Sequence, residues 1–354
     1  MLVKVGIENF RRIEGAELTF DPRGTGILGA NASGKTSLLE AVFFLGQGRS
    51  FRSTERNKLL GPAASFFRVV GEVATPRGQI TVGSEYSNGR TATKLAGESI
   101  SSIAEVAEIL PLQLIDPGVH RLIEEGSARR RRLLDWGVFH VKQEFLHFWR
   151  RYQRALQQRN AALRAGEDIS LVAAWERELV GYGEAVDIAR REYAETLGSY
   201  FQILGTQLLG EAAALEYRRG WVADQTLEEA LQNARARDQR LRLTTVGPHR
   251  ADIIFRLRGA LARDLVSRGQ QKMLASAFVL AQIQLRAQRA TVPTCLLLDD
   301  PAAELDVDNL GKLLHAIDSV PSQLIVTSVS EGGLRGMHIG RKFHVEQGRF
   351  APML

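Results

Sequence analysis

The octet Gly29–Thr36, GANASGKT, constrains the fold and the function of this chain more than any other segment. It matches the pattern G-x-x-x-x-G-K-[ST], in which a glycine-rich turn presents backbone N–H groups to a nucleotide phosphate and leads directly into a helix N-terminus. An apolar pair precedes the octet and the apolar run SLLEAVFFLG follows it, as expected for a strand, a loop and a helix. The sequence therefore predicts an α/β domain that binds a nucleotide.

The loop residues have distinct expected roles. Lys35 is expected to reach the β- and γ-phosphates, and the hydroxyl of Thr36 is expected to hold Mg²⁺. Ser37 is a further polar contact at the start of the helix. The candidate nucleotide-binding residues of this segment are Gly29, Ala30, Asn31, Ala32, Ser33, Gly34, Lys35, Thr36 and Ser37, and the predicted cofactors are ATP and Mg²⁺.

Composition indicates a globular protein without a membrane span. The chain has 354 residues, of which 44% are hydrophobic, enough for one large core or two moderate ones. No stretch approaches the roughly 18 to 20 apolar residues of a membrane span, and the start of the sequence lacks the apolar block of a signal peptide. We therefore expect a cytoplasmic protein with no membrane partner. The single cysteine, Cys295, excludes an intramolecular disulfide framework.

Positive charge is concentrated in one segment. Residues 121–164 contain eleven basic and four acidic residues, a net charge of +7, whereas the whole chain carries +6. One interpretation is a surface that binds the phosphate backbone of nucleic acid, with Arg129, Arg130 and Arg131 as candidate DNA-binding residues. The other interpretation is pairing within the protein, because residues 167–195 hold eight acids against three arginines. Both interpretations remain open from the sequence.

Composition changes along the chain suggest a helical insertion in an ATPase body. The first 20 residues resemble a β-hairpin, and residues 66–95 contain three β-rich runs separated by turn residues. Residues 127–240 are rich in Ala, Leu, Glu and Arg with helical periodicity. The predicted domains are 1–115, the N-terminal part of the ATPase lobe; 116–242, a helical lobe; and 243–354, the C-terminal part of the ATPase lobe.

Two carboxylates follow an apolar run at residues 294–298, which is typical of a buried parallel strand. Asp299 stands where it can position Mg²⁺ opposite Thr36, usually through water. Asp300 stands where it can orient or deprotonate the attacking water. Lys35, Asp299 and Asp300 are therefore the candidate catalytic residues, and Thr36 and Asp299 the candidate metal ligands.

The segment SRGQQ, residues 267–271, begins another predicted helix. Its hydroxyl, its flexible glycine and its backbone donors suit a γ-phosphate that another protein surface presents. Ser267, Gly269 and Gln270 are the candidate contacts. After the acidic strand end, PAAELD places Glu304 and Asp306 in a loop, where Asp306 either contacts a partner protomer or caps the next helix.

Together these motifs resemble ABC-type ATPase heads of the SMC and DNA-repair branch, and most closely the RecF family. In that resemblance SRGQQ is the signature motif, LLLDD the Walker B motif and AELD the D-loop. Three further motifs carry the closer likeness: GRSFR at 48–52, RRRRLLDWG at 129–137 and TVGPHRAD at 245–252. The histidine of the last motif, His249, has no companion for acid–base work, which favours a hydrogen-bonded structural role.

The resemblance implies a fold, an activity and partners. The fold is an ABC-type ATPase head, a mixed sheet with a P-loop and an antiparallel β subdomain, with an inserted helical lobe. The activity is a slow, DNA-stimulated ATPase in which two protomers enclose two ATP molecules. The implied partners are gapped DNA and single-strand/duplex junctions, a second copy of the chain, and RecR and RecO, which assist RecA loading. Arg11 and Arg12 then contact the nucleotide, or are exposed hairpin charges, and Gln113 occupies the Q-loop position.

Two other functions fit parts of the sequence. A transporter-type ABC ATPase subunit would use the helical lobe to hold membrane helices, which the basic segment and the GPHR motif disfavour. An ATP-switched DNA scaffold with vestigial hydrolysis would not need the complete set Lys35, Asp299 and Asp300.

Overall fold

A computed structural model describes residues 1–303 and 305–353, with only the backbone described at 169–171. The chain divides into two compact units. The first unit comprises residues 1–120 and 275–354, and the second comprises residues 121–274. Among the described residues, no helix is long and apolar enough to cross a membrane.

The first unit contains two six-stranded sheets. The antiparallel sheet has the order β2-β1-β4-β5-β6-β7, and the second sheet has the order β15-β14-β3-β13-β12-β8. The antiparallel strands are β1 (Leu2–Phe10), β2 (Ile13–Thr19), β4 (Phe66–Thr75), β5 (Gly78–Ser87), β6 (Arg90–Leu95) and β7 (Glu98–Ser99). The other strands are β3 (Gly24–Leu28), β8 (Leu112–Ile115), β12 (Thr294–Leu298), β13 (Ser322–Ser328), β14 (Arg341–Glu346) and β15 (Arg349–Met353). The predicted N-terminal hairpin and the predicted β-rich runs at 66–95 are therefore present, and β14 and β15 form a further hairpin at the C-terminal end.

The helices of the first unit are α1 (Lys35–Gln47), α2 (Ala104–Ile109) and α11 (Val307–Ser319), with short 3₁₀ helices at Arg56–Leu59, Pro117–His120 and Glu331–Leu334. Helix α1 packs against strands of both sheets, namely β1, β4 and β5 of one and β8 and β13 of the other. Its side chains from Ser37 to Gly46 are almost all buried, which explains why its sequence is apolar on every side. Both sheets therefore hold the helix that follows the phosphate loop.

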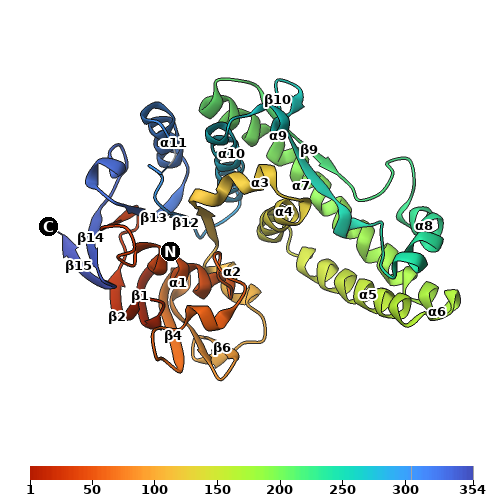
Figure 1. Cartoon of the computed structure of the whole chain (residues 1–354), viewed down its shortest axis with the longest axis horizontal. Helices are drawn as coiled ribbons and strands as arrows, with labels where there is room; N and C mark the ends of the chain where they lie inside the picture. The colour runs from red at the N-terminus through yellow and green to blue at the C-terminus, as the bar shows by residue number, and fades with distance from the viewer. Residues whose placement is uncertain (304, 354) are drawn as a thin grey trace. The chain divides into compact units, whose positions relative to one another are not determined.

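The second unit is mainly helical and carries a three-stranded sheet of order β11-β10-β9. Its elements are α3 (Arg121–Glu124), α4 (Ser127–Val141), α5 (Phe145–Ala165), α6 (Ile169–Ala174), α7 (Glu176–Leu209), β9 (Ala213–Arg218), α8 (Leu227–Leu241), a 3₁₀ helix at Pro248–Arg250, β10 (Asp252–Leu257), β11 (Ala260–Leu261) and α9 (Ala262–Leu265). Helix α10 (Arg268–Ala287) begins in this unit and continues into the first. Figure 1 shows α5 and α7 side by side, with α8 beside them.

Two boundaries differ from the sequence-based domains. Residues 116–120, which we expected in the helical lobe, belong to the first unit. Residues 243–274, which we expected in the ATPase lobe, belong to the second unit. The reason is strand pairing, because β10 pairs antiparallel with β9, and β9 directly follows the long helix α7. The helical insertion therefore includes a small sheet whose second half lies beyond the helix-rich sequence.

Candidate nucleotide-binding site

Three parallel strands bring the predicted chemical groups of the first unit together. Strand β13 lies between β3 and β12, and its register places Thr327 beside Ile27 and Val326 beside Leu298. The phosphate loop follows β3, and Asp299 and Asp300 follow β12, so all of these groups meet at the carboxyl ends of the strands, where α/β sheets bind ligands. A pocket of ≈ 650 Å³ opens there. It is lined by Arg11, Arg12, Asn31, Ala32, Gly34, Lys35, Thr36, Ser37, Arg52, Leu60, Pro62, Asp299 and Asp300.

The loop has the backbone geometry of an anion site. Gly34 has a φ of 120°, which L side chains rarely adopt, and a Cβ on Gly29 would lie 2.4 Å from the carbonyl oxygen of Val345. Both positions therefore require glycine. Helix α1 begins at Lys35 without a side-chain cap and without an acid in its first turn. Its first backbone N–H groups are left for a ligand, and an uncapped helix N-terminus favours a phosphate.

Lys35 is held against the loop by backbone oxygens. Its Nζ donates to the carbonyl oxygens of Gly29 at 2.7 Å and Ala30 at 2.9 Å. Burial lowers the pKa of Lys35, while the charges of Asp300 and Asp299 act in the opposite direction. Because both acceptors are neutral carbonyls, a phosphate in the pocket offers this ammonium a stronger, charge-assisted partner.

Thr36 and Asp299 form the predicted metal-binding pair. The hydroxyl of Thr36 lies 3.0 Å and 3.1 Å from the two carboxylate oxygens of Asp299. Burial raises the pKa of Asp299, and the neighbouring Asp116 and Asp300 raise it further, against hydrogen bonds from Thr327 and Thr36. A hydroxyl and one carboxylate beside phosphate oxygens fit Mg²⁺, which prefers oxygen ligands and keeps several waters.

Thr327 connects the side chain of Asp299 to the backbone of Asp300. Its hydroxyl donates to Asp299 Oδ1 at 2.7 Å and accepts from the backbone N–H of Asp300 at 2.9 Å. Asp300 has a φ of 43°, a left-handed conformation that costs free energy for a residue other than glycine. The hydrogen bond to Thr327 supports this conformation, so Thr327 positions both acids at the pocket.

Glu40 organises the basic rim of the pocket. Its side chain is fully buried, and Arg11 donates to both carboxylate oxygens, at 2.9 Å and 2.8 Å. Ser50 also donates to Glu40, and the Arg52 guanidinium lies 3.7 Å from the same carboxylate. Arg12 instead donates to the carbonyl oxygen of Ala32 in the phosphate loop at 3.0 Å. Of the two interpretations of Arg11 and Arg12, the structure favours the pocket, because both residues line it.

Several predicted residues lie elsewhere. Gln113 is buried in β8, where its Nε2 donates to Gln282 Oε1 at 3.1 Å, so the structure places it in the core and not at the pocket lining. Gln113 pairs with Leu296, two residues before the end of β12, so it lies short of the carboxyl ends at which the pocket opens. Asp306 caps α11 by accepting from the backbone N–H of Asn309 at 2.8 Å. The other D-loop acid, Glu304, lies outside the described residues.

The signature residues belong to the second unit. Ser267 and Gln270 bond reciprocally, because Gln270 N–H donates to Ser267 Oγ at 3.3 Å and Ser267 N–H donates to Gln270 Oε1 at 3.0 Å. This arrangement is a capping box at the start of α10. A side chain on Gly269 would meet nothing within 4 Å, so the space beside it is open.

The candidate DNA-binding arginines are mostly engaged within the second unit. Arg130 is buried and donates to both carboxylate oxygens of Asp252, at 2.7 Å and 3.1 Å. Arg131 donates to Ser127 and to the carbonyl oxygen of Ala251 at 2.7 Å, and burial lowers its pKa. Arg129 lies 3.8 Å from a carboxylate oxygen of Glu125. Arg130 is therefore a structural residue, which corrects its assignment to DNA.

Sequence reasoning missed several contributors to the site, among them Arg52 of the GRSFR motif, which lines the pocket. Leu60 and Pro62 supply an apolar part of the pocket lining and lie in a segment that carried no motif. Thr327 carried no visible signal, because its role depends on which strands are neighbours. Glu40 did have a signal, since it is the one acid inside the apolar run of α1, and a buried acid requires a cationic partner.

Comparisons with known proteins agree with this geometry. Residues 1–349 match the family described as the RecF/RecN/SMC N terminal domain. The chain is 40% identical over 356 residues to the DNA replication and repair protein RecF of Pseudomonas putida, covering 98% of this chain and 97% of that protein. It is 38% identical over 325 residues to the RecF protein of Thioalkalivibrio sulfidiphilus, with 90% of each chain covered.

The fold is also that of solved structures. The structure of the recombination mediator protein RecF with ATP, in the RecFOR pathway, superposes with a TM-score of 0.89 over 100% of this chain and 97% of that one, at 24% sequence identity. A likeness at this identity establishes the ABC-type ATPase head fold.

Proposed function

Because the chain belongs to the RecF family within the RecF/RecN/SMC group, we propose that it is an ATP-hydrolysing, DNA-binding protein of recombinational repair and replication-fork maintenance. The observation that supports this function best is the meeting of Lys35, Thr36 and Asp299 at the uncapped N-terminus of α1. The relatives carry the name DNA replication and repair protein. The match to this family over residues 1–349 speaks against the transporter alternative.

The pocket residues divide the work of hydrolysis. The loop backbone and Lys35 hold the β- and γ-phosphates, and Thr36 with Asp299 hold Mg²⁺, which neutralises charge on the phosphate oxygens when bound. Asp300 orients the attacking water, which displaces ADP from the γ-phosphorus. The side chain of Asp300 is one carbon shorter than that of a glutamate, so it positions the water less well and turnover is slow.

A second copy of the chain completes the site. Ser267 and Gly269 stand at the N-terminus of α10, a 20-residue helix whose first turn carries no acid. Such a terminus stabilises negative charge, and we assign its target to the γ-phosphate on the partner protomer. ATP, but not ADP, then joins two protomers, so that the nucleotide state controls association.

The ATP-bound dimer binds DNA through phosphates, with a preference for gaps and single-strand/duplex junctions. It acts in the cytoplasm together with RecR and RecO to assist RecA loading. The solved relative described as a recombination mediator in the RecFOR pathway supports this part of the proposal.

The test is the steady-state ATPase rate with no DNA, gapped duplex, single-stranded DNA and linear duplex. We expect a low basal rate and the strongest stimulation by gapped duplex. ATP binding without turnover on any DNA would favour the scaffold with vestigial hydrolysis. Turnover that no DNA changes, with no DNA binding in the presence of ATP, would contradict the proposed function.

A further inference from the structure

Helix α5 has two faces with different charge environments. Its 21 residues include five arginines and no acidic residue. One of the five, Arg159, is fully buried, whereas the other four side chains are exposed: Arg150, Arg151, Arg154 and Arg164. The packing of the second unit therefore encloses one of these arginines and leaves the other four side chains at the surface.

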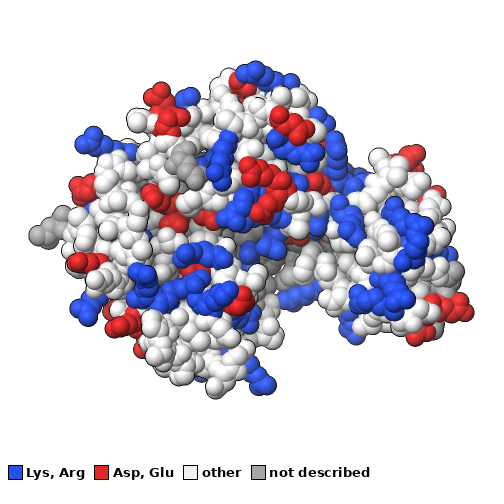
Figure 2. All heavy atoms as spheres, in the orientation of Figure 1, with Lys and Arg blue, Asp and Glu red and all other residues white. Residues whose placement is uncertain are grey.

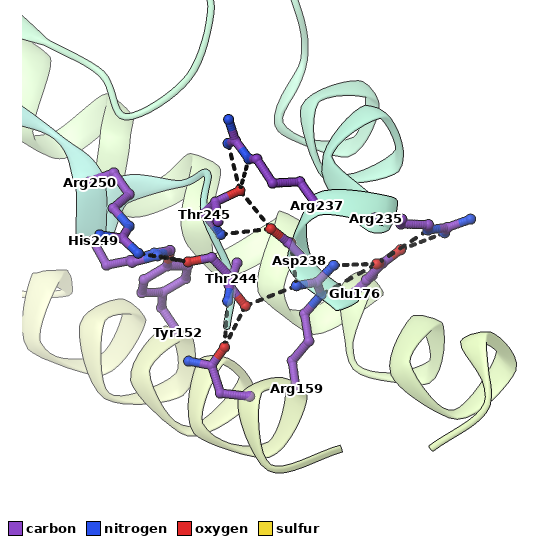
Figure 3. Close-up of polar contacts among 11 residues, drawn as sticks. Tyr152, Arg159, Glu176, Arg235, Arg237, Asp238, Thr244, Thr245, His249 and Arg250 are labelled. Carbon is purple, nitrogen blue, oxygen red and sulfur yellow. Dashed lines mark hydrogen bonds and ion pairs between the residues drawn. The ribbon is translucent and has the colours of Figure 1, made fainter. Parts of the chain in front are cut away.

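The inner face of α5 is anchored by ion pairs (Figure 3). Arg159 donates to Asp238 Oδ2 of α8 at 2.8 Å and to Glu176 Oε1 of α7 at 3.0 Å. It also donates to the hydroxyl of Thr244 at 2.9 Å. A fully buried guanidinium with two carboxylate partners and a hydroxyl is satisfied within the protein, so Arg159 is structural.

The segment that precedes β10 forms hydrogen bonds with the same face of α5 at two positions along the helix (Figure 3). Asn160 Oδ1 accepts from the backbone N–H of Thr244 at 2.7 Å. About two turns earlier in α5, Tyr152 bonds to His249 Nδ1 at 2.6 Å. His249 Nε2 lies 2.9 Å from the carbonyl oxygen of Thr244, which can only accept, so Nε2 carries the proton and Nδ1 accepts from Tyr152. Thr244, and His249 of the adjoining TVGPHR motif, therefore fix the rotation of α5 about its axis.

The outer face is a basic groove. Arg150, Arg151 and Arg154 line a hollow of ≈ 460 Å³ together with Gln143, Leu146 and His147. Within the part of the chain that the structure describes, Arg151, Arg154 and Arg164 make no ion pair. Figure 2 shows Lys and Arg side chains gathered on the visible face of the second unit, over the region where α5 and α8 lie in Figure 1.

We propose that the outer face of α5, from Arg150 to Arg164, is a contact surface for the DNA phosphate backbone, and that the TVGPHR motif serves to hold this face in position. The inference rests on the proposed function, because it identifies where the DNA binds. The stretch from Arg150 to Arg164 spans about 21 Å of helix, the length along which one strand of duplex DNA presents about six phosphates.

The composition of the groove favours nucleic acid over an acidic protein. Protein–protein interfaces have a core that is apolar and depleted in charge, whereas protein–DNA interfaces are strongly positive and polar. Here Leu146 is the one apolar side chain among the six that line the groove. Arginine and glutamine side chains can donate to phosphate oxygens, and such contacts do not depend on the DNA sequence. This agrees with the proposed binding of DNA through its phosphates.

The test compares two triple variants that remove the same charge. Arg150→Gln/Arg151→Gln/Arg154→Gln removes three positive charges from the groove. Arg23→Gln/Arg77→Gln/Arg90→Gln removes three positive charges from exposed arginines of the first unit. DNA affinity is measured with ATP on gapped duplex over a series of salt concentrations. Each lost phosphate contact flattens the slope of log affinity against log salt by about 0.9, so we expect the groove variant to lose about 2 to 3 in slope. The first-unit variant is expected to keep the wild-type slope.

The controls distinguish a loss of folding, a failure of the proposed function and a wrong assignment of the DNA-binding surface. Both variants are expected to keep the wild-type unfolding temperature and basal ATPase rate, because the substituted side chains are exposed and outside the nucleotide pocket. A groove variant with the wild-type slope, or a first-unit variant with an equal loss of slope, overturns the assignment of α5 while leaving the proposed function intact. Wild-type protein that fails to bind DNA at all overturns both.

Discussion

The nucleotide pocket of the first unit and the Arg159 cluster of the second both contain basic side chains, but these side chains have different partners. In the cluster, the charge of Arg159 is matched by Glu176 and Asp238, and its side chain is fully buried. In the pocket, the acceptors of Lys35 and Arg12 among the described residues are all neutral carbonyl oxygens, and both side chains border a space of ≈ 650 Å³. A cation that is fully paired stabilises the fold, whereas one that is held by carbonyls beside an open space is available to an anionic ligand.

The largest expected effect tests the buried Arg159 cluster. Arg159→Leu leaves Asp238 and Glu176 buried without their shared partner, and breaking a buried ion pair in this way costs about 3 to 5 kcal/mol. We expect this loss in the free energy of unfolding by urea. Arg154→Leu on the exposed face of the same helix is the matched control and is expected to change stability little. A small loss for Arg159→Leu would mean that the cluster does not hold the unit together.

The second prediction concerns the pH dependence of the same region. Burial lowers the pKa of His249 to about 4, below its ordinary value near 6.5. The unfolded chain therefore binds a proton that the folded chain does not between these two pKa values, so stability falls as the pH is lowered through this window and is constant below it. The loss amounts to at most about 3 kcal/mol. His249→Gln keeps hydrogen-bonding groups without titrating, so its unfolding free energy should lack this contribution, and equal pH profiles for the two proteins would contradict the prediction.

Lys35→Arg tests the nucleotide pocket. The variant keeps the positive charge but loses the compact ammonium that fits between the loop carbonyls, because a guanidinium is planar and larger. We expect some ATP binding to remain and the steady-state ATPase rate to fall by about 100-fold, equivalent to about 2.7 kcal/mol. Urea unfolding should be nearly unchanged, in contrast to Arg159→Leu. An unchanged ATPase rate would remove Lys35 from the site.

Thr327→Val sharpens the account of how the acids are placed. Valine has the shape of threonine but cannot bond to Asp299 or to the backbone of Asp300. The expected loss is about tenfold in kcat, about 1.4 kcal/mol, with a smaller change in KM for ATP. Thr327→Ser, which restores the hydroxyl, should recover most of the rate. If valine and serine behave alike, the hydroxyl does not position the carboxylates.

The sequence predicted the pocket better than the second unit for a physical reason. Lys35, Thr36 and Asp299 belong to short motifs in which local backbone geometry decides the role, so the strand-to-helix pattern was sufficient. Thr327 acts through a neighbouring strand, and strand order is a long-range property that no local pattern records.

The basic segment shows the limit of charge counting. Arg130 and Arg154 stand in the same run of positive charge, yet Arg130 is buried against Asp252 and Arg154 lines a groove. The difference arises because α4, which carries Arg130, packs against β10, whereas Arg154 lies on the exposed face of α5. The packing of α4 on β10 joins residues 122 positions apart. The same dependence hid the role of TVGPHR, because its His249 bonds to Tyr152, which lies on a helix 97 positions earlier in the sequence.

Sedimentation velocity with ATP and with ADP tests most directly the claim that the pocket is one half of an ATP site shared between two copies. The account predicts that wild-type protein dimerises with ATP and stays monomeric with ADP, which lacks the γ-phosphate that both protomers contact. Ser267→Arg places a bulky cation where the partner's phosphate would lie, so this variant should bind ATP as a monomer and neither dimerise nor hydrolyse it. Wild-type protein that remains monomeric at saturating ATP, or a variant that dimerises and turns over normally, would contradict the shared site.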